Sequence, residues 1–314
     1  MELYKLTKKQ IAIRLILLVV FLIALYVLMC VRACPKWSDK VLIPPEAATA
    51  ENPEGGTQET AIAPPEGFAR IPAAEDSFLA FMRRQPVWAA DSSIMTYEGR
   101  AIPSVNAAAV YTLSLPESPG KPDLQQCADT VIRFWAEYFY ETKQYDRLAF
   151  SYSSGYETCW EDWSKGFRYL TVPAAGWTFR LKLKGQDDSL QQMHNYLQAV
   201  MHYAGTLSLE AESHTISISE AHAGDIICKG GTPGHVVMIV DEARNEAGER
   251  RFLIAQGLTP SQSAHILSGW RDAPDPWYTE EQLSAQEIKF SSYCFEPDAL
   301  RRWKEGFPNA ADTK

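Results

Sequence analysis

Seventeen consecutive residues without a charge, Leu15 to Val31, restrict the organisation of this chain more than any other feature. As a helix that rises about 1.5 Å per residue, this run nearly matches the roughly 30 Å hydrocarbon core of a bilayer. Arg14 directly precedes it, and a long basic side chain there can reach the headgroups. We therefore predict an N-terminal membrane anchor or signal segment over residues 1–33, with residues 15–31 in the bilayer.

The charges around this run indicate its orientation. Lys5, Lys8 and Lys9 lie in a very short tail before it, which favours a cytoplasmic N-terminus and an exported C-terminal domain. We expect a single-pass protein of the bacterial cytoplasmic membrane. A cleaved signal peptide is an alternative, as is a lipoprotein signal that uses Cys30 or Cys34 as the lipidated residue.

The next segment, residues 34–67, is rich in Pro, Ala, Glu and Gly and has little apolar periodicity. Such a composition buries too little apolar surface to offset the entropy of ordering the chain, so it predicts a disordered stalk. One globular domain is expected over residues 68–307, followed by a tail, residues 308–314. Because 46% of the chain is apolar, this domain has enough side chains to build a core.

The charge balance excludes one class of partner. Residues 1–40 carry seven basic and two acidic side chains, so residues 41–314 hold the remaining 23 basic and 37 acidic ones, a net charge of −14. Affinity for nucleic acid comes mostly from Lys and Arg that bind phosphates. We therefore expect no nucleic acid as a partner.

Apolar spacing predicts an α+β domain. Three- and four-residue spacing over residues 123–142 is the clearest helix pattern of the chain, and Cys127 lies on its apolar stripe, about one turn into the expected helix. Further helices are expected over residues 76–84 and 189–203, and strands over residues 93–97, 108–115, 148–152, 178–184, 225–229, 235–243 and 251–257. A long helix followed by antiparallel strands is an α+β arrangement.

The last two of these strands form a hairpin that brings two polar side chains together. His235 begins the sequence HVVMIVD and, by the period of two, shares its face with Val237 and Ile239. If the loop spans residues 245–248, Val237 lies opposite Gln256, and a shift by two residues puts His235 itself opposite. In both registers Gln256 lies opposite or diagonal to His235, within reach of a long side chain.

A histidine oriented in this way needs a nucleophile or a metal to become catalytic. The six histidines show no HExxH pattern and no close pairing with cysteine, so we expect no metal and no cofactor. Cys127 is the better partner, because the unpaired N–H groups and the dipole at a helix N-terminus favour a thiolate. Structural roles also fit these residues: Cys127 as a small core residue, His235 as a strand histidine, Gln256 as an edge amide.

Two sets of motifs resemble known families. A helix-borne cysteine followed by AGDIICKGGTPGHVVMIVDEA and FLIAQG resembles the NlpC/P60-like branch of the papain-like cysteine peptidases and amidases. That resemblance implies a papain-like α+β fold with a helix packed on an antiparallel sheet, and a site with Cys127 as nucleophile, His235 as general base and Gln256 as the orienting residue. Ala-Asp follows Cys127 where these peptidases commonly have Ser-Gly, and Gln256 stands where they usually have His. Further candidates for the site are Asp129, Gln262 and His265.

The blocks DLQQCADTVIRFWAEYFY, HYAGTLSL, GGTPGHVVMIVDEA and LIAQGLTPSQSAHIL are similar to an uncharacterised bacterial family of exported proteins, known as a domain of unknown function. This resemblance covers nearly the whole body, from about Phe68 onward, and implies no activity.

We expect a membrane-tethered cell-envelope cysteine hydrolase that acts on amide or ester bonds, with peptidoglycan peptides as the substrate that export suggests. The alternative is a non-catalytic envelope module that binds glycan or an envelope protein through aromatic residues such as Trp277 and Tyr278. Candidates for lining a glycan groove are Trp160, Trp163, Trp177, Trp270 and Trp277.

Overall fold

The computed structural model describes residue 9, residues 13–22 and 25, and then residues 55–90, 92–102, 106–113, 123–269, 275–291 and 293–307. They belong to two units, residues 1–40 and 41–314, each considered by itself. In the first unit residues 13–22 are helical and exposed. Among the described residues, none of the helices has both the length and the apolar character to cross a bilayer. The remainder of the expected membrane segment lies outside them, as do Cys30, Cys34, residues 34–54 and residues 308–314.

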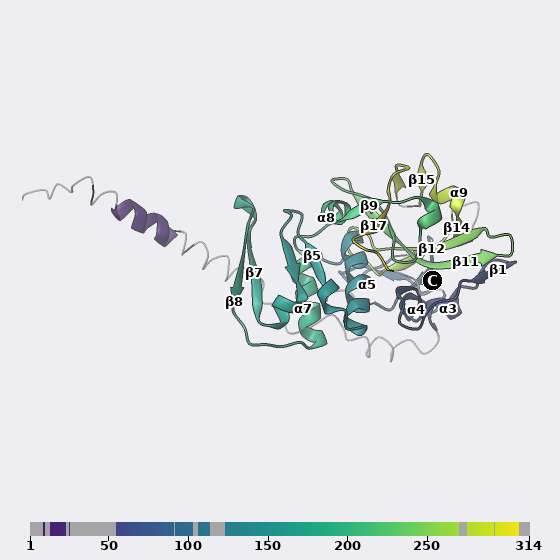
Figure 1. Cartoon of the computed structure of the whole chain (residues 1–314), viewed down its shortest axis with the longest axis horizontal. Coiled ribbons are helices and arrows are strands. Elements are labelled where there is room, and N and C mark those ends of the chain that lie inside the picture. Colours follow the sequence, from purple (N-terminus) through teal and green to yellow (C-terminus); the bar gives the residue numbers. More distant parts are fainter. Residues whose placement is uncertain are drawn as a thin grey trace, which may run out of the picture. The chain divides into compact units, whose positions relative to one another are not determined.

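The second unit is an α+β body, which confirms the predicted class (Figure 1). Its helices are α3 (Gln58–Ala61), α4 (Phe78–Arg83), α5 (Cys127–Glu141), α6 (Trp160–Ser164), α7 (Leu190–Met201), α8 (Thr206–Ala211) and α9 (Glu280–Leu283), with 3-10 turns η1 (Tyr145–Arg147), η2 (Pro173–Ala175) and η3 (Ile218–Glu220). Its strands are β1 (Phe68–Arg70), β2 (Ile94–Met95), β3 (Ala101–Ile102), β4 (Ala107–Val110), β5 (Ala149–Ser151), β6 (Glu157–Cys159), β7 (Phe167–Val172), β8 (Trp177–Lys182), β9 (Ser213–Thr215), β10 (Ile226–Lys229), β11 (His235–Asn245), β12 (Arg250–Gln256), β13 (His265–Leu267), β14 (Trp277–Thr279), β15 (Ile288–Lys289), β16 (Cys294–Phe295) and β17 (Leu300–Trp303).

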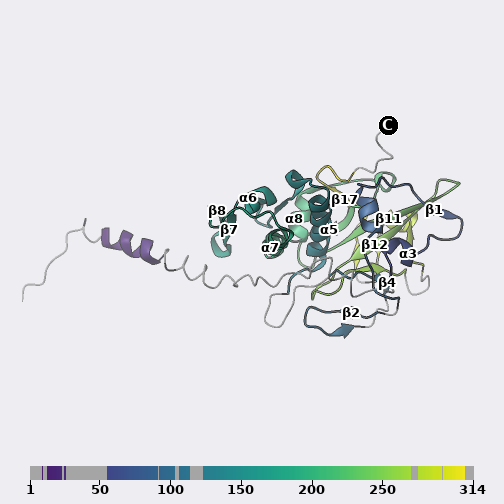
Figure 2. The same cartoon turned by 90° about the horizontal axis from the view of Figure 1, so that it is seen from below.

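Within the described ranges, nine strands form one antiparallel sheet around the long strand β11. Their order is β4-β13-β12-β11-β10-β17-β9, while β1 pairs with the far end of β11 and β14 pairs with β12. Four two-stranded sheets accompany it, among them the β7–β8 hairpin. Figures 1 and 2 both place β7 and β8 at one end of the body, beyond α7, and β1 at the other end.

The β11–β12 hairpin reaches the predicted register by a different route. Arg244 pairs with Arg250 rather than with the expected Glu249, so the turn is one residue longer than predicted. An irregularity between Ile239 and Asp241 then shifts the register back. Met238 pairs with Ala255, so the next pair sets Val237 opposite Gln256, and His235 lies diagonal to Gln256, as the sequence indicated.

The sheet is covered on both faces. Strands β11 and β12 contribute one apolar cluster with the segment around α9, β15 and β16, whose members include Val237, Ile239, Phe252, Ile254, Leu283, Ile288, Phe290 and Phe295. Helix α5 contacts β11 and β12 but contributes no residue to this cluster. Because side chains alternate along a strand, α5 covers the opposite face, on which Val236 and Met238 project.

The folded body begins before residue 68, where the sequence suggested a stalk. Gln58 of α3 is fully buried; its amide donates to the carbonyl of Val240 at 3.0 Å and its oxygen accepts from the Tyr111 hydroxyl at 2.7 Å. Arg70 and Arg83 both bind the carboxylate of Asp241, at 2.7 and 2.8 Å. The prediction was wrong for residues 55–67 because polar contacts with the sheet, invisible to apolar periodicity, hold this segment.

Candidate functional site

Helix α5 begins at Cys127, so the thiol occupies the first position of the helix and not a position one turn further in. Gln125 adopts a φ of 64°, in the left-handed region, where a right-handed helix cannot continue. The backbone N–H of Gln126 donates to the Asp129 carboxylate at 3.0 Å, which caps the new N-terminus. The apolar stripe of the sequence thus extends one turn beyond the actual start of the helix.

The sulfur of Cys127 lies between the helix N-terminus and the start of β11. The side chain is largely buried, and burial raises the pKa of the thiol. The backbone N–H groups of Val236 and Ala128 act in the opposite direction, because both are directed at the sulfur and favour the thiolate. The thiol therefore lies near the backbone of the residue that directly follows His235.

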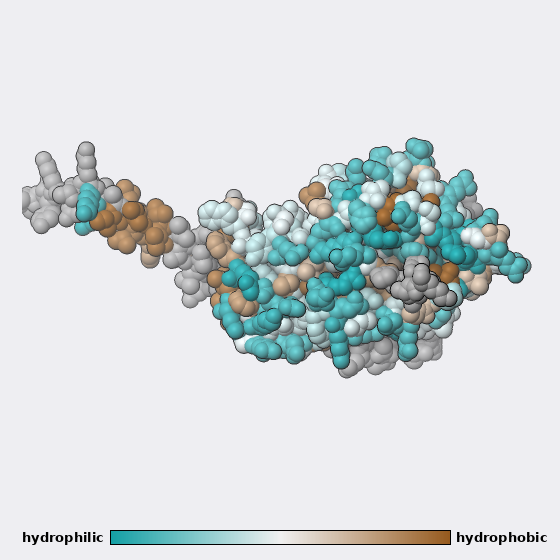
Figure 3. Space-filling model, viewed as in Figure 1, coloured by the Kyte–Doolittle hydropathy of each residue, from teal (hydrophilic) through white to brown (hydrophobic). Residues whose placement is uncertain are grey.

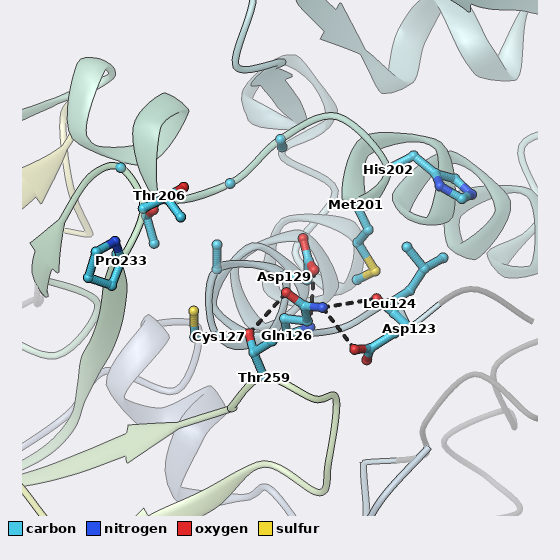
Figure 4. Close-up of a pocket in the computed structure, with 16 residues that line it drawn as sticks. Asp123, Leu124, Gln126, Cys127, Asp129, Met201, His202, Thr206, Pro233 and Thr259 are labelled. Carbon is cyan, nitrogen blue, oxygen red and sulfur yellow. Dashed lines mark hydrogen bonds between the residues drawn. The ribbon is translucent and has the colours of Figure 1, made fainter. Parts of the chain in front are cut away.

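Cys127 also faces a cavity of about 560 Å³ (Figure 4). Its walls are the start of α5, the end of α7, the start of α8, the loop that precedes β11, and Thr259. The lining residues are Asp123, Leu124, Gln126, Cys127, Ala128, Asp129, Met201, His202, Ala204, Gly205, Thr206, Gly231, Thr232, Pro233, Gly234 and Thr259. In Figure 4 the Cys127 sulfur extends from α5 toward the space beside Pro233 and Thr206. A cavity of this volume is in the range of small-ligand sites.

Gln126 ties the start of α5 to the segment after β12. Its amide nitrogen donates to the carboxylate of Asp123 at 3.1 Å, and its oxygen accepts from the hydroxyl of Thr259 at 3.0 Å (Figure 4). Gly257 adds a close backbone approach, since a Cβ there would lie 2.2 Å from Oγ1 of Thr130. These contacts fix the start of α5, where Cys127 lies, against the segment that follows β12.

His235, Gln256 and His265 form a buried chain of hydrogen bonds. Nε2 of His235 lies 3.0 Å from Oε1 of Gln256, and Nε2 of Gln256 lies 3.0 Å from Nε2 of His265. Nδ1 of His265 lies 3.0 Å from the carbonyl of Ser263, which can only accept. His265 therefore donates through Nδ1 and accepts the Gln256 amide through Nε2, which leaves the Gln256 oxygen to accept from Nε2–H of His235.

This chain fixes the tautomer of His235. With its proton on Nε2, neutral His235 carries a lone pair on Nδ1, which has no hydrogen-bond partner among the described residues. The rings of Tyr293 and Phe295 lie 5.4 and 5.9 Å from the imidazole. Burial lowers the pKa of His235, against the opposing hydrogen bond to Gln256, and burial lowers the pKa of His265 to about 4. Both rings are therefore neutral at neutral pH.

The structure brings some of the candidate residues together and separates others. Cys127 and Asp129 line the cavity, whereas His235, Gln256 and His265 do not, and among the described residues no hydrogen bond joins the Cys127 sulfur to His235. Gln262 forms a β-bridge with Thr96 and does not line the cavity.

The aromatic residues proposed for a binding surface are mostly buried. Trp277 and Tyr278 are 3% and 5% exposed, because both pack beside β12, so they cannot form an open groove. Trp160 and Trp163 are buried as well, and Trp270 lies outside the described residues. Trp177, at 64% exposed, is the exception.

The carboxyl group of Asp129, which lines the cavity, has a raised pKa. It is buried, and burial raises its pKa to about 7, with a further rise from Asp123, although backbone N–H groups of Gln126 and Gln125 oppose the shift. In the part of the chain that the structure describes, no three His, Cys, Asp or Glu side chains cluster as metal ligands.

Two further residues of the site were missed in the sequence. Asp123 and Thr259 line the cavity but are not among the predicted site residues, although both lie in blocks that carry the family resemblance, DLQQCADTVIRFWAEYFY and LIAQGLTPSQSAHIL. A second sequence signal was proximity, because Asp123 precedes Cys127 by four residues and Thr259 follows Gln256 by three.

Together, these features define a class: an α+β protein with a buried thiol at a helix N-terminus, facing a cavity and backed by a histidine-amide-histidine chain. The chain belongs to the family described as Domain of unknown function (4846), which matches residues 58–302. No curated protein and no solved structure matches the chain.

Proposed function

We propose that this protein is a cysteine hydrolase in which Cys127 attacks the carbonyl carbon of an amide or an ester. The supporting observation is the position of the sulfur: it lies at the first residue of a fifteen-residue helix, on the wall of a cavity, with two backbone N–H groups directed at it. The helix N-terminus opposes the effect of burial on the pKa of this thiol, and the cavity gives a substrate access to the sulfur.

In this proposal Nδ1 of His235 takes the thiol proton as the sulfur bonds to the substrate carbonyl carbon. The proton passes through water, because the His235 ring does not line the cavity. The N–H groups of the first turn of α5 stabilise the negative charge on the carbonyl oxygen. The protonated imidazole returns its proton to the leaving amine or alcohol. Water then hydrolyses the thioester and restores the thiol.

The papain-like assignment, the membrane tether and the substrate belong to the same proposal. Support comes from the order of a helix-borne cysteine, a His-led strand and a following amide-bearing strand, which the structure arranges around one hairpin. The N-terminal apolar run supports export, and peptidoglycan peptides are the amide substrates of that compartment.

An electrophilic peptide probe tests the proposal. Because Cys294 is exposed and unpaired, the experiment is done in a Cys294→Ser background. We expect labelling of this protein and its loss in Cys127→Ala. Cys228→Ser is the matched control, because Cys228 is a buried thiol of β10 whose pKa burial raises to about 12, and its loss should leave labelling unchanged. Equal labelling of the Cys127→Ala variant contradicts the proposal and leaves the non-catalytic binding module as the better account.

A further inference from the structure

The β7–β8 hairpin exposes a stripe of apolar side chains on one face of β8 and its extension. The β8 stripe consists of Trp177, Phe179, Leu181 and Leu183, which alternate with polar residues and are 64%, 46%, 43% and 53% exposed. Of the seven large hydrophobic residues that are exposed in the described part of the body, these are four. Figure 3 shows hydrophobic side chains at the surface at this end of the body.

The β7–β8 pairing holds the β8 stripe at the surface. All six residues of β8 pair with β7, from Val172 opposite Trp177 to Phe167 opposite Lys182. On the inner face Tyr169 is buried, and its hydroxyl accepts from the backbone N–H of Cys159 at 3.0 Å. Because the buried Tyr169 fixes the inner face of the hairpin against the body, the stripe on the opposite face stays exposed.

The tip of the hairpin is also apolar. Residues 172–177 read VPAAGW and carry no charge. Gly176 adopts a φ of 66°, which ends the 3-10 turn and starts β8 with the exposed indole of Trp177. Trp prefers the boundary between headgroups and hydrocarbon, because its ring is apolar and its N–H is polar.

The charge of the hairpin is opposite to that of the body. Residues 165–184 carry five basic and no acidic side chains, although residues 41–314 have a net charge of −14. Arg180 pairs with Asp162, and Lys165 pairs with Glu161. Lys182 and Lys184 form no ion pair with any residue that the structure describes, so their charges are available to an external anion.

We propose that the β8 stripe and the tip of this hairpin dock on the surface of an anionic lipid bilayer. Apolar side chains of the stripe enter the interface, while Lys182 and Lys184, which project from the opposite face of the same edge strand and its extension, add positive charge that attracts the anionic headgroups. Apolar side chains interleaved with lysines are the composition of interfacial membrane-binding elements. The partner also fits the N-terminal apolar run, which we expect to keep the body beside a bilayer. The inference does not depend on the proposed hydrolase activity.

Vesicle sedimentation of the full-length chain tests this surface. Leu17, Val20 and Leu25 are each replaced by Asn in all samples, so that the N-terminal run does not itself partition. The probes are vesicles of phosphatidylcholine alone and of phosphatidylcholine with an equal part of phosphatidylglycerol. We expect binding that is stronger on the anionic vesicles and that weakens with salt.

Two sets of variants identify the binding element. Trp177→Ser with Phe179→Ser should weaken partition at least about tenfold, and Lys182→Glu with Lys184→Glu should weaken it by about fivefold or more for each lysine on anionic vesicles only. Leu207→Ser, which removes an exposed leucine of α8, and Lys143→Glu, which removes an exposed lysine after α5, are the matched controls and should bind as before. Near-ultraviolet circular dichroism verifies that each variant is folded.

Several results would overturn the proposal. Absence of binding to either vesicle is one, and equal loss of binding in the hairpin variants and the matched controls is another. Dimers in analytical ultracentrifugation that require Trp177, without vesicle binding, would instead assign the stripe to a second copy of the chain.

Discussion

At the scale of single residues, the reactivity of Cys127 depends on opposing influences on one atom. Burial favours the neutral thiol, whereas the N–H groups of Val236 and Ala128 favour the thiolate. Burial also keeps His235 neutral. At neutral pH the two side chains are therefore a thiol and an imidazole, and in the proposed mechanism the proton moves only when a substrate reacts. For this proposed transfer, Nδ1 of the imidazole must carry the lone pair that accepts the proton, whereas a permanently charged thiolate is not required.

Gln256 fixes the tautomer of His235 by accepting its Nε2–H, so the removal of Gln256 should change the tautomer ratio of the imidazole. In Gln256→Ala, Nε2–H of His235 loses its acceptor, and we expect both neutral tautomers of His235 to be populated instead of one. Long-range proton–nitrogen NMR correlations of the ring report this ratio directly. Gln262→Ala is the control, because Gln262 is a buried amide that, among the described residues, forms no hydrogen bond with His235. An unchanged tautomer in Gln256→Ala would show that another group orients the ring.

Asp129 and His265 give the stability of the protein an unusual dependence on pH. The pKa of Asp129 is about 7 in the folded state against an ordinary 3.8, so the folded state keeps a proton that the unfolded state releases, and stability falls as pH rises between these values. The pKa of His265 is about 4 against 6.5, so its contribution is complete above pH 6.5 and is lost as pH falls through about 4.

Between about pH 4 and 6.5 the two contributions therefore oppose each other. In Asp129→Asn, which keeps an oxygen for the Gln126 N–H, we expect the free energy of unfolding to rise with pH in this window, by up to about 1.4 kcal/mol per unit more steeply than in the wild type. Urea unfolding at several pH values measures it. Identical pH slopes in the two proteins would rule out a protonated Asp129. Asp188→Asn, on the exposed surface, should leave the slope unchanged.

At the scale of elements, the sequence predicts what is local and misses what the tertiary structure imposes. The helix over residues 123–142 and the hairpin of β11 and β12 were predicted because their periodicities are local. The true start of α5 was not, because the left-handed conformation of Gln125 depends on distant partners: the side chain is buried, Arg133 donates to its amide oxygen, and the hydroxyl of Ser261 donates to its carbonyl at 3.2 Å. The register of His235 and Gln256 was predicted because the bulge in β11 compensated for the longer turn.

The contact between α5 and the end of β12 makes Gly257 a sensitive position. A Cβ there meets Oγ1 of Thr130 at 2.2 Å and the carbonyl of Gln126 at 3.0 Å. We expect Gly257→Ala to push the start of α5 away from β12, to lower the free energy of unfolding by about 1–3 kcal/mol, and to reduce labelling of Cys127.

Thr130→Ala should relieve the steric clash that Gly257→Ala creates. Oγ1 of Thr130 is buried without a hydrogen-bond partner among the described residues, so its removal alone should cost little. In the Gly257→Ala background it should restore part of the lost stability, because the nearest atom is gone while the carbonyl of Gln126 remains. Additive effects of the two substitutions in a double-mutant cycle would show that they do not meet.

At the scale of the whole molecule, the α+β class followed from the order of elements, but the order of strands in the sheet did not. Strand β13 inserts between β12 and β4, and this pairing sets His265 opposite Gln256. His265 was a candidate whose place in the sheet the sequence did not predict, since the eight residues between it and Gln256 contain no hairpin signal. The positions of His235 and Gln256 were thus predictable from the β11–β12 hairpin, whereas the position of His265 on β13 was not.

Residues 55–67, before β1, are also folded although their composition did not indicate it. The fold should therefore begin near residue 55. Gln58 is bound to Val240 and Tyr111, and Ile62 is 6% exposed, so residues 55–67 are part of the core structure. A chain that starts at residue 55 should keep the thermal midpoint of the full-length protein. A chain that starts at residue 68 should lose about 2–4 kcal/mol, from two buried hydrogen bonds and one apolar side chain. Gln58→Ala in the longer chain isolates the hydrogen bonds and should cost about half as much. Equal stability of the two truncated chains in urea would restore the boundary at residue 68 and make residues 55–67 a dispensable stalk.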